Sequence, residues 1–431
     1  MAVGLLPYLY LPVASAFNPS MDWGDPENWT NFWRVVTRHQ YGLDITKSRP
    51  LPVLLSQIGL HYKILFEQFG IVWVVFGSAG LIELFFKKRI LFFLSLIFNA
   101  LTGPLVAYLT NVDMTIRDPF ALAEQKALVA VMYLPFFMWW GLLMAIGLGA
   151  GIRWLNQKNF KRNFQTAWIG IVAAILMLFG YSTFKKESMH AYYFTEKFKD
   201  NLLQTIEPNS IVIGNWDPFV FPMMYYQHVE SEAKEIIFMD VELLRRTWYI
   251  RMLQRWYPEF MQRSELPVRE FLNAVAPFEN GEKFNPMFIQ QKYIAMINSL
   301  IDRNVDERPV YMTIYSPIRP LESGIAANYK REPYFVGYRL RKELNNLTTE
   351  IPKSVDMNFF IHSKASSDRM ANMIKNYYSI LFAERAMMFE ANNPAHSKVL
   401  YEQALELAES ELIRNRIYAR YQKVLERLNN N

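Results

Sequence analysis

A short acidic and aromatic run near the start of the chain contains the residue types that bind and activate sugars. Residues 22–26 read DWGDP, and two further tryptophans and two arginines follow before residue 39. Aromatic faces pack on sugar rings, arginine binds phosphate through paired hydrogen bonds, and a carboxylate accepts a proton from an attacking hydroxyl. A tight turn at a bilayer interface is the alternative, because glycine, aspartate and proline form turns and tryptophan favours that interface. The candidate rim residues are Asp22, Asp25 and Arg38, and the candidate substrate contacts are Trp23 and Tyr41.

Two more groups of polar residues lie where ligands often bind. Arg117 and Asp118 belong to a charged segment, 111–126, between two apolar runs. Arg117, next to Asp118, would contact a lipid phosphate at the mouth of a span, and solvated loop charges are the alternative. Asn215 and Asp217 follow a β-branched run, and ligands often bind after the carboxyl ends of parallel strands. Asp217 before a proline is equally a helix N-cap, which is the favoured interpretation.

These residues must be positioned by a membrane protein. The chain has 431 residues, of which 52% are hydrophobic and 16% aromatic, values that are high for a soluble protein. About 20 apolar residues cross a hydrocarbon core about 30 Å thick. Four runs meet that length, at 65–86, 90–110, 127–152 and 165–184.

The basic residues of short loops predict the orientation of these spans. KKR at 87–89 separates the first two runs, and four basic residues between 153 and 162 separate the last two. Such loops are cytoplasmic. Residues 18–64, 111–126 and everything after 185 are therefore predicted to lie outside, on the periplasmic side of a bacterial inner membrane.

Charge, cysteine and histidine exclude several other kinds of site. The net charge of +6 is spread along the chain, without a basic run that would track nucleic acid. It fits membrane flanks and anionic lipid head groups better. The chain has no cysteine, and none of its six histidines lies at ligand spacing from another. No cofactor and no metal ligand is assigned, although a divalent metal stays open.

After residue 185 the pattern changes to that of an α/β domain. Strands are predicted at 210–215, 235–240 and 309–315, with helices at 219–229, 241–257 and 286–302. Strand, helix and strand at this spacing indicate parallel strands. From 367 the pattern is helical and resembles one tetratricopeptide unit, with a simple helical cap as the alternative. The predicted domains are 1–184 in the membrane, 185–360 as an extracytoplasmic α/β domain and 361–431 as a helical region.

Several motifs, in order along the chain, resemble those of one family. LPYLYLP at 6–12, DWGDP at 22–26 and FWRVVTRHQYG at 32–42 resemble motifs of membrane glycosyltransferases related to protein O-mannosyltransferases, long catalogued as a domain of unknown function. Asp22 replaces the asparagine usual in that family. Further similar segments are 117–118, 217–230, 235–253 and 308–313.

The resemblance implies a C-type glycosyltransferase fold with its active site outside the membrane. It implies a polyprenyl-phosphate-linked sugar as donor, a protein or glycan hydroxyl as acceptor, and an acidic residue as base. The family's acidic signature lies in an amino-terminal half that this chain lacks, so no catalytic residue is assigned. We expect a carboxy-terminal portion that does not turn over substrate alone, either a fragment or split-gene product, or one completed by a separate chain. The alternative is a non-catalytic membrane-anchored module that displays a binding domain.

Overall fold

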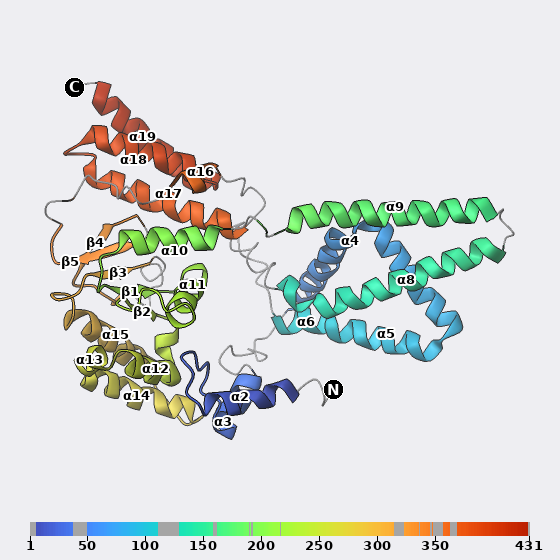
Figure 1. Ribbon diagram of the computed structural model, residues 1–431, viewed down its shortest axis with the longest axis horizontal. Helices are drawn as coiled ribbons and strands as arrows, with labels where there is room; N and C mark the ends of the chain where they lie inside the picture. Colours follow the sequence, from blue (N-terminus) through green and yellow to red (C-terminus); the bar gives the residue numbers. More distant parts are fainter. Residues whose placement is uncertain are drawn as a thin grey trace. The chain divides into compact units, whose positions relative to one another are not determined.

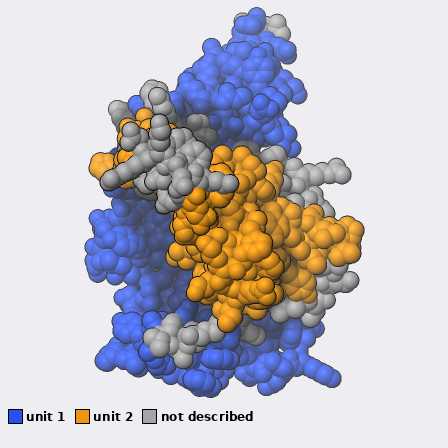
Figure 2. Space-filling model, turned by 90° about the vertical axis from the view of Figure 1, so that its right-hand side faces the viewer, with its two compact units in different colours: residues 1–37, 191–431 blue, residues 38–190 orange. Residues whose placement is uncertain are grey.

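The structure is a computed structural model that divides into two compact units. Unit 1 comprises residues 1–37 and 191–431, and unit 2 comprises residues 38–190 (Figure 2). The domain boundaries expected at 184 and 360 remain predictions. The residues that the structure describes are 6–37, 50–110, 129–157, 162–188, 190, 193–215, 217–313, 323–335, 337–344, 347, 357–362 and 369–429.

Unit 2 is built from long apolar helices. They are α4 (Leu51–Lys87), α5 (Arg89–Thr102), α6 (Pro104–Thr110), α8 (Leu134–Gln157) and α9 (Arg162–Glu187) (Figure 1). Three helical stretches are long and apolar enough to cross a membrane: Leu51–Lys87, Arg89–Thr110 and Leu134–Trp154. The fourth predicted span falls in α9, where the apolar stretch found is Gly170–Lys185. These helices are those of an integral membrane protein.

Glycines shape the packing of unit 2. Gly70 has φ 76° and interrupts α4, where a side chain at that φ would be strained. Gly80 of α4 and Gly147 of α8 lie where the two helices cross. A Cβ on Gly80 would be 1.9 Å from the carbonyl oxygen of Leu143, and one on Gly147 would be 2.0 Å from that of Phe76. The backbones of α4 and α8 are therefore in direct contact, as small residues permit in membrane helices.

A five-stranded mixed sheet lies at the centre of unit 1, in the order β2-β1-β3-β5-β4. β1 (Ile211–Gly214) pairs in parallel with β2 (Ile237–Asp240) and β3 (Val310–Met312). This confirms the predicted parallel strands. β5 (Tyr338–Arg341) runs antiparallel to β3 and to β4 (Lys330–Pro333), and the sequence analysis had not predicted these two strands.

Helices cover both sides of this sheet (Figure 1). In that view α10 (Phe194–Thr205) and α17 (Arg369–Phe389) lie above it, and α12 (Thr247–Trp256) and α15 (Pro286–Asp302) lie below it. The remaining helices of unit 1 are η1 (Leu6–Leu9), α2 (Tyr10–Ser15), α3 (Trp29–Val36), α11 (Asp217–His228), η3 (Leu243–Arg245), α13 (Pro258–Gln262), α14 (Glu265–Glu279), α16 (Met357–His362), α18 (Pro394–Leu407) and α19 (Glu411–Asn429).

A buried ion pair connects the carboxy-terminal helices to the sheet. Arg385 of α17 and Glu332 of β4 are 1% and 0% exposed, and their charged atoms lie 3.4 Å apart. Arg385 also donates to the carbonyl oxygen of Pro333 at 2.7 Å, and Arg341 pairs with Glu332 at 2.6 Å. The helices are therefore fixed to the sheet edge. The tetratricopeptide likeness and the C-type fold remain predictions.

Candidate functional site

The amino-terminal segment, residues 6–37, packs against helices that follow the sheet strands. The ring of Trp23 lies 5.1 Å from that of Trp248 on α12 and 6.4 Å from that of Phe221 on α11. Asp25 Oδ2 lies 3.8 Å from Arg251 Nη1, also on α12. The DWGDP run is thus part of unit 1, where aromatic and charged contacts hold it.

Local backbone geometry explains the sequence of this run. Gly24 has φ +84°, and a Cβ there would lie 2.4 Å from Val35 Cγ2. Asp25 also has a positive φ, 49°, which aspartate tolerates better than most residues. Asn31 Nδ2 donates to the carbonyl oxygen of Asp25 at 2.9 Å, and Asn28 caps the start of α3. The turn formers noted in the sequence therefore do form a tight turn.

Three carboxylates meet at this turn. Asp22 is buried and accepts a hydrogen bond from Ser15 Oγ at 3.0 Å, and burial raises the pKa of its carboxyl. The neighbouring charge of Asp25 raises the pKa of Glu27. One oxygen from each of Asp22, Asp25 and Glu27 lies within 4.8 Å of the others. Oxygen ligands of this kind suit a divalent cation, although Arg251 competes for Asp25.

The aromatic contacts place Trp23 near the carboxyl edge of the parallel strands. Phe221 lies one turn into α11, which follows β1, and Trp248 is the second residue of α12, which follows β2 and η3. β2 lies on one side of β1, and β3 lies on the other. The connection from β1 to β2 and the connection from β2 to β3 therefore run in opposite directions across the sheet. Ligands of α/β sheets bind at such points.

Two polar atoms at this edge have no hydrogen-bond partner among the described residues. They are Asn215 Oδ1, directly after β1, and Thr313 Oγ1, directly after β3. Thr313 is buried, and a Cβ on Gly214 would lie 3.2 Å from its hydroxyl oxygen. Because buried polar groups are usually paired, these two atoms mark a place where a ligand can supply the partner.

An α12 side chain and an α14 backbone carbonyl anchor the rest of the segment. Arg255 Nη1 donates to Asn18 Oδ1 at 2.6 Å, and Arg34 donates to the carbonyl oxygen of Glu279. The Glu279 carboxylate in turn accepts a hydrogen bond from Thr247 Oγ1 at 2.9 Å, at the start of α12. The contacts of the segment extend from the rings of Trp23, Phe221 and Trp248, which we call the aromatic cluster, to the end of α14.

The predicted site residues fall into four groups. Asp22, Trp23 and Asp25 lie in one cluster, and Asn215 lies at the sheet edge. Asp217 begins α11, which fits the predicted helix start. Arg38, Tyr41, Arg117 and Asp118 lie outside the described residues.

The sequence analysis did not single out Glu27, Phe221 or the residues of α12 that complete the cluster. Trp248, Arg251 and Arg255 recur at steps of three and four, so they lie on one helical face. That spacing was the available signal, but it does not identify the segment that covers the face.

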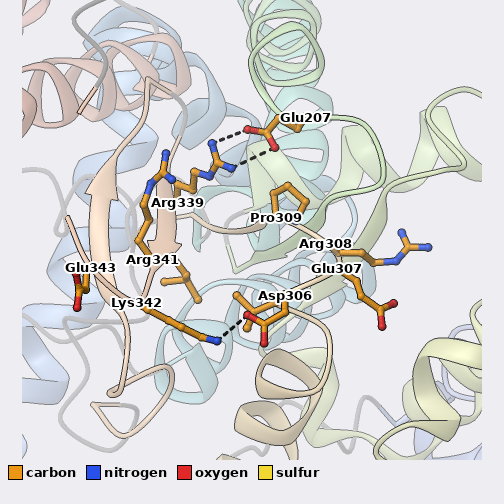
Figure 3. A pocket seen from close by; sticks show the side chains of 11 residues that line it. Glu207, Asp306, Glu307, Arg308, Pro309, Arg339, Arg341, Lys342 and Glu343 are labelled. Carbon is orange, nitrogen blue, oxygen red and sulfur yellow. Dashed lines mark hydrogen bonds and ion pairs between the residues drawn. The ribbon is translucent and has the colours of Figure 1, made fainter. Parts of the chain in front are cut away.

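A polar groove of about 530 Å³ lies at the opposite, amino-terminal edge of the sheet (Figure 3). Arg339 and Glu207 point toward each other and pair at 2.5 Å, and Lys342 pairs with Asp306 at 2.6 Å. Arg308 Nη1 donates to the carbonyl oxygen of Asn209 at 3.0 Å. Since these charges satisfy one another, we interpret the groove as a stabilised sheet edge.

Comparison with known proteins finds a distant relative. No family model matches the chain, and no solved structure matches it significantly. The protein O-mannosyl-transferase TMEM260 of Mus musculus is 24% identical over 282 residues, which cover 60% of this chain. The chain spans 36% of that relative's length. The chain is thus distantly related to a protein O-mannosyl-transferase and, with its apolar helices, resembles a membrane glycosyltransferase.

Proposed function

We propose that the chain is the carboxy-terminal part of a membrane glycosyltransferase that uses a polyprenyl-phosphate-linked sugar. The acceptor would be a hydroxyl of a protein or glycan. The distant relation to a protein O-mannosyl-transferase carries this proposal, and the membrane helices support it. In the reaction, the acceptor oxygen bonds to the anomeric carbon, the bond from that carbon to the phosphate oxygen breaks, and the hydroxyl proton passes to a base.

The aromatic cluster would hold a sugar at the carboxyl edge of the sheet. Trp23 and Trp248 are partly buried, and Phe221 is more exposed, so ring surface is available for packing. Thr313 Oγ1 and Asn215 Oδ1 would pair with sugar hydroxyls at the same edge. Asp22, Asp25 and Arg38 would shape the rim, with Tyr41, Arg117, Asp118 and Asp217 as further predicted contacts.

No described carboxylate is assigned as the catalytic base. Asp22 is buried and accepts a hydrogen bond from Ser15, while Asp25 pairs with Arg251. Both are better suited to supporting the turn than to accepting a substrate proton. The base is therefore expected elsewhere in the enzyme.

Chain connectivity supports a location of unit 1 on a single side of the membrane. The segment before unit 2 pairs with the chain after unit 2 through Arg34 and Glu279, and through Asp25 and Arg251. The chain must then cross the membrane an even number of times between them. Three stretches qualify by length and composition, so α9 would be the remaining crossing. Together with the basic loops, this favours an extracytoplasmic unit 1.

A sugar-transfer assay with paired variants tests the proposal. Membranes expressing the chain in its native genetic surroundings would receive a polyprenyl-phosphate-linked labelled mannose and a serine- and threonine-containing peptide. Trp23→Ala should lower kcat/KM roughly three- to tenfold, because an aromatic contact is worth about 0.5–1.5 kcal/mol. Tyr418→Ala, which changes an exposed aromatic residue of α19, should leave transfer unchanged.

The results of this assay distinguish an enzyme from a non-catalytic module that displays a binding domain. No transfer by the wild-type membranes, with the chain folded, would favour the non-catalytic module. Transfer that Trp23→Ala and Tyr418→Ala leave equally intact would remove the aromatic cluster from the site. Thermal unfolding of each variant controls for lost packing of the segment.

A further inference from the structure

The end of α14 lies beside α3 in Figure 1, and exposed aromatic and apolar side chains lie on α3 and around the turn from α14 to α15. Six large side chains there are between 45% and 73% exposed. We call these residues the interfacial patch: Trp29, Trp33, Phe278, Phe284, Met287 and Phe288. A patch of this kind on a folded protein usually marks an interaction surface.

Ring contacts order each half of the patch, and one hydrogen bond joins the two halves. The rings of Trp29 and Trp33 stack at 5.8 Å with an interplanar angle of 14°, and those of Phe278 and Phe284 are 5.0 Å apart. Arg34 donates to the carbonyl oxygen of Glu279, which joins α3 to the end of α14. The patch is therefore a formed surface built on helix ends.

The packing of α3 does not explain why Trp29 and Trp33 are exposed. Phe32 already fills the buried position of this helix, while Trp29 and Trp33 lie on its exposed side. The Asn285 side chain accepts hydrogen bonds from the backbone N–H groups of Met287 and Phe288, so these two side chains are presented at a capped helix start. The local geometry keeps both sets of apolar side chains in solvent.

We infer that the interfacial patch rests on the lipid surface of the membrane that the same chain crosses. α3 ends at Val36 and the apolar helix α4 begins at Leu51, so the connection spans no more than about 50 Å when fully extended. A second connection links the end of α9 at Glu187 to the start of α10 at Phe194. Unit 1 is thereby tethered to the bilayer twice.

The chemistry of the patch fits the interfacial zone of a bilayer. Tryptophan is enriched there, and its apolar ring with one polar N–H suits that zone. Glu282 and Lys283 lie in the turn between Phe278 and Phe284, and Arg34 lies at Glu279, so charges of both signs flank the patch. Zwitterionic head groups therefore suffice, and anionic lipid is not required.

Site-directed spin labelling tests this inference directly, because the natural chain has no cysteine. The full chain would carry a nitroxide at Met287→Cys, and the matched control would carry it at Leu412→Cys on α19. The two native side chains are 71% and 62% exposed. After reconstitution into phosphatidylcholine vesicles, the accessibility of each label to membrane-dissolved oxygen and to a water-soluble nickel chelate is measured.

The ratio of oxygen to nickel accessibility should be several-fold higher for Met287→Cys than for Leu412→Cys. Trp33→Cys should give the same result and guards against a local effect of one substitution. Equal ratios at all three positions would overturn the inference. Dipolar broadening at Met287→Cys that vanishes on dilution with unlabelled chain would also overturn it, because a second copy of the chain would then cover the patch.

Discussion

Unit 2 and the sheet domain of unit 1 distribute polar and apolar side chains in opposite ways. Along α5, Ile90, Phe93 and Ile97 are exposed while Ser95 is buried, and His61 of α4 is also buried. In the sheet domain, the apolar residues of β1 are fully buried and most charges lie outside. The difference indicates that the surface of unit 2 is solvated by lipid and that of the sheet domain by water.

The comparison also shows two ways of holding elements together. In unit 2 small residues let helix backbones meet, as Gly80 and Gly147 do, because lipid gives helices little hydrophobic reason to associate. In unit 1 a large apolar core surrounds a few paired charges, of which Glu332 and Arg385 are the most buried. Each prediction below tests one side of this contrast.

The largest effect is expected at the α4–α8 crossing. Gly80→Leu places a side chain where a Cβ alone would be 1.9 Å from the carbonyl oxygen of Leu143, so the helices cannot approach and unit 2 should fail to assemble. Gly151→Leu on α8 is the control, since a Cβ there meets nothing within 4 Å. Size-exclusion chromatography in mild detergent checks both, and normal elution of Gly80→Leu would refute the close crossing.

A smaller loss of stability is expected when a buried charge in unit 1 loses its partner. Arg385→Met should destabilise unit 1 by about 3–5 kcal/mol, toward the lower value because Arg341 still pairs with Glu332. Arg420 pairs with Glu390 at the same 3.4 Å but is 49% exposed, so Arg420→Met should cost at most about 1 kcal/mol. Denaturant unfolding measures both, and equal costs would contradict the assigned burial.

The lipid-facing surface can be tested with a charge. Ile97→Lys on α5 should disfavour membrane insertion by about 2.5–3.5 kcal/mol if the side chain is near the centre of the span. Val399→Lys on the exposed side of α18 should change stability by less than about 0.5 kcal/mol. The measurement is the fraction of chain integrated into membranes, and unchanged integration of Ile97→Lys would argue against a lipid-exposed α5.

The smallest effect concerns Asp22. Burial raises the pKa of its carboxyl above the ordinary 3.8, so its stabilising contribution is present at low pH and is lost as pH rises through the raised value. Asp22→Asn removes the charge and can still accept from Ser15 Oγ. Its melting temperature should slightly exceed that of the wild type at pH 7 and equal it well below pH 3.8. A lower melting temperature at pH 7 would show that the charge is needed.

Much of the fold could be predicted because local patterns determine it. The buried runs of β1, β2 and β3 and the helices α11 and α15 follow from apolar periodicity. β4 and β5 were missed because KREP and YRLR carry charges instead of a strand pattern. The buried charge of Glu332 in β4 is paired by Arg385, which lies far along the chain, so a local pattern does not reveal it.

The candidate site was predictable only in its local part. The DWGDP turn is fixed by its own glycine and aspartate backbone, and the sequence indicated both a turn and a site. Its packing on α12 could not be inferred, since contacts such as Arg255 with Asn18 join residues 237 positions apart. The spacing of apolar residues along the sequence does not show which distant helix covers a tryptophan.

The division of unit 1 into two separated stretches of chain has a consequence for biosynthesis. The amino-terminal segment emerges first, but its partners on α12 and α14 are made only after all of unit 2. Closing an unstructured loop of 245 residues would cost about 5 kcal/mol of chain entropy. Folding of unit 2, residues 38–190, replaces most of that loop with fixed helices, so the helices made in between lower the entropic cost of joining the two stretches.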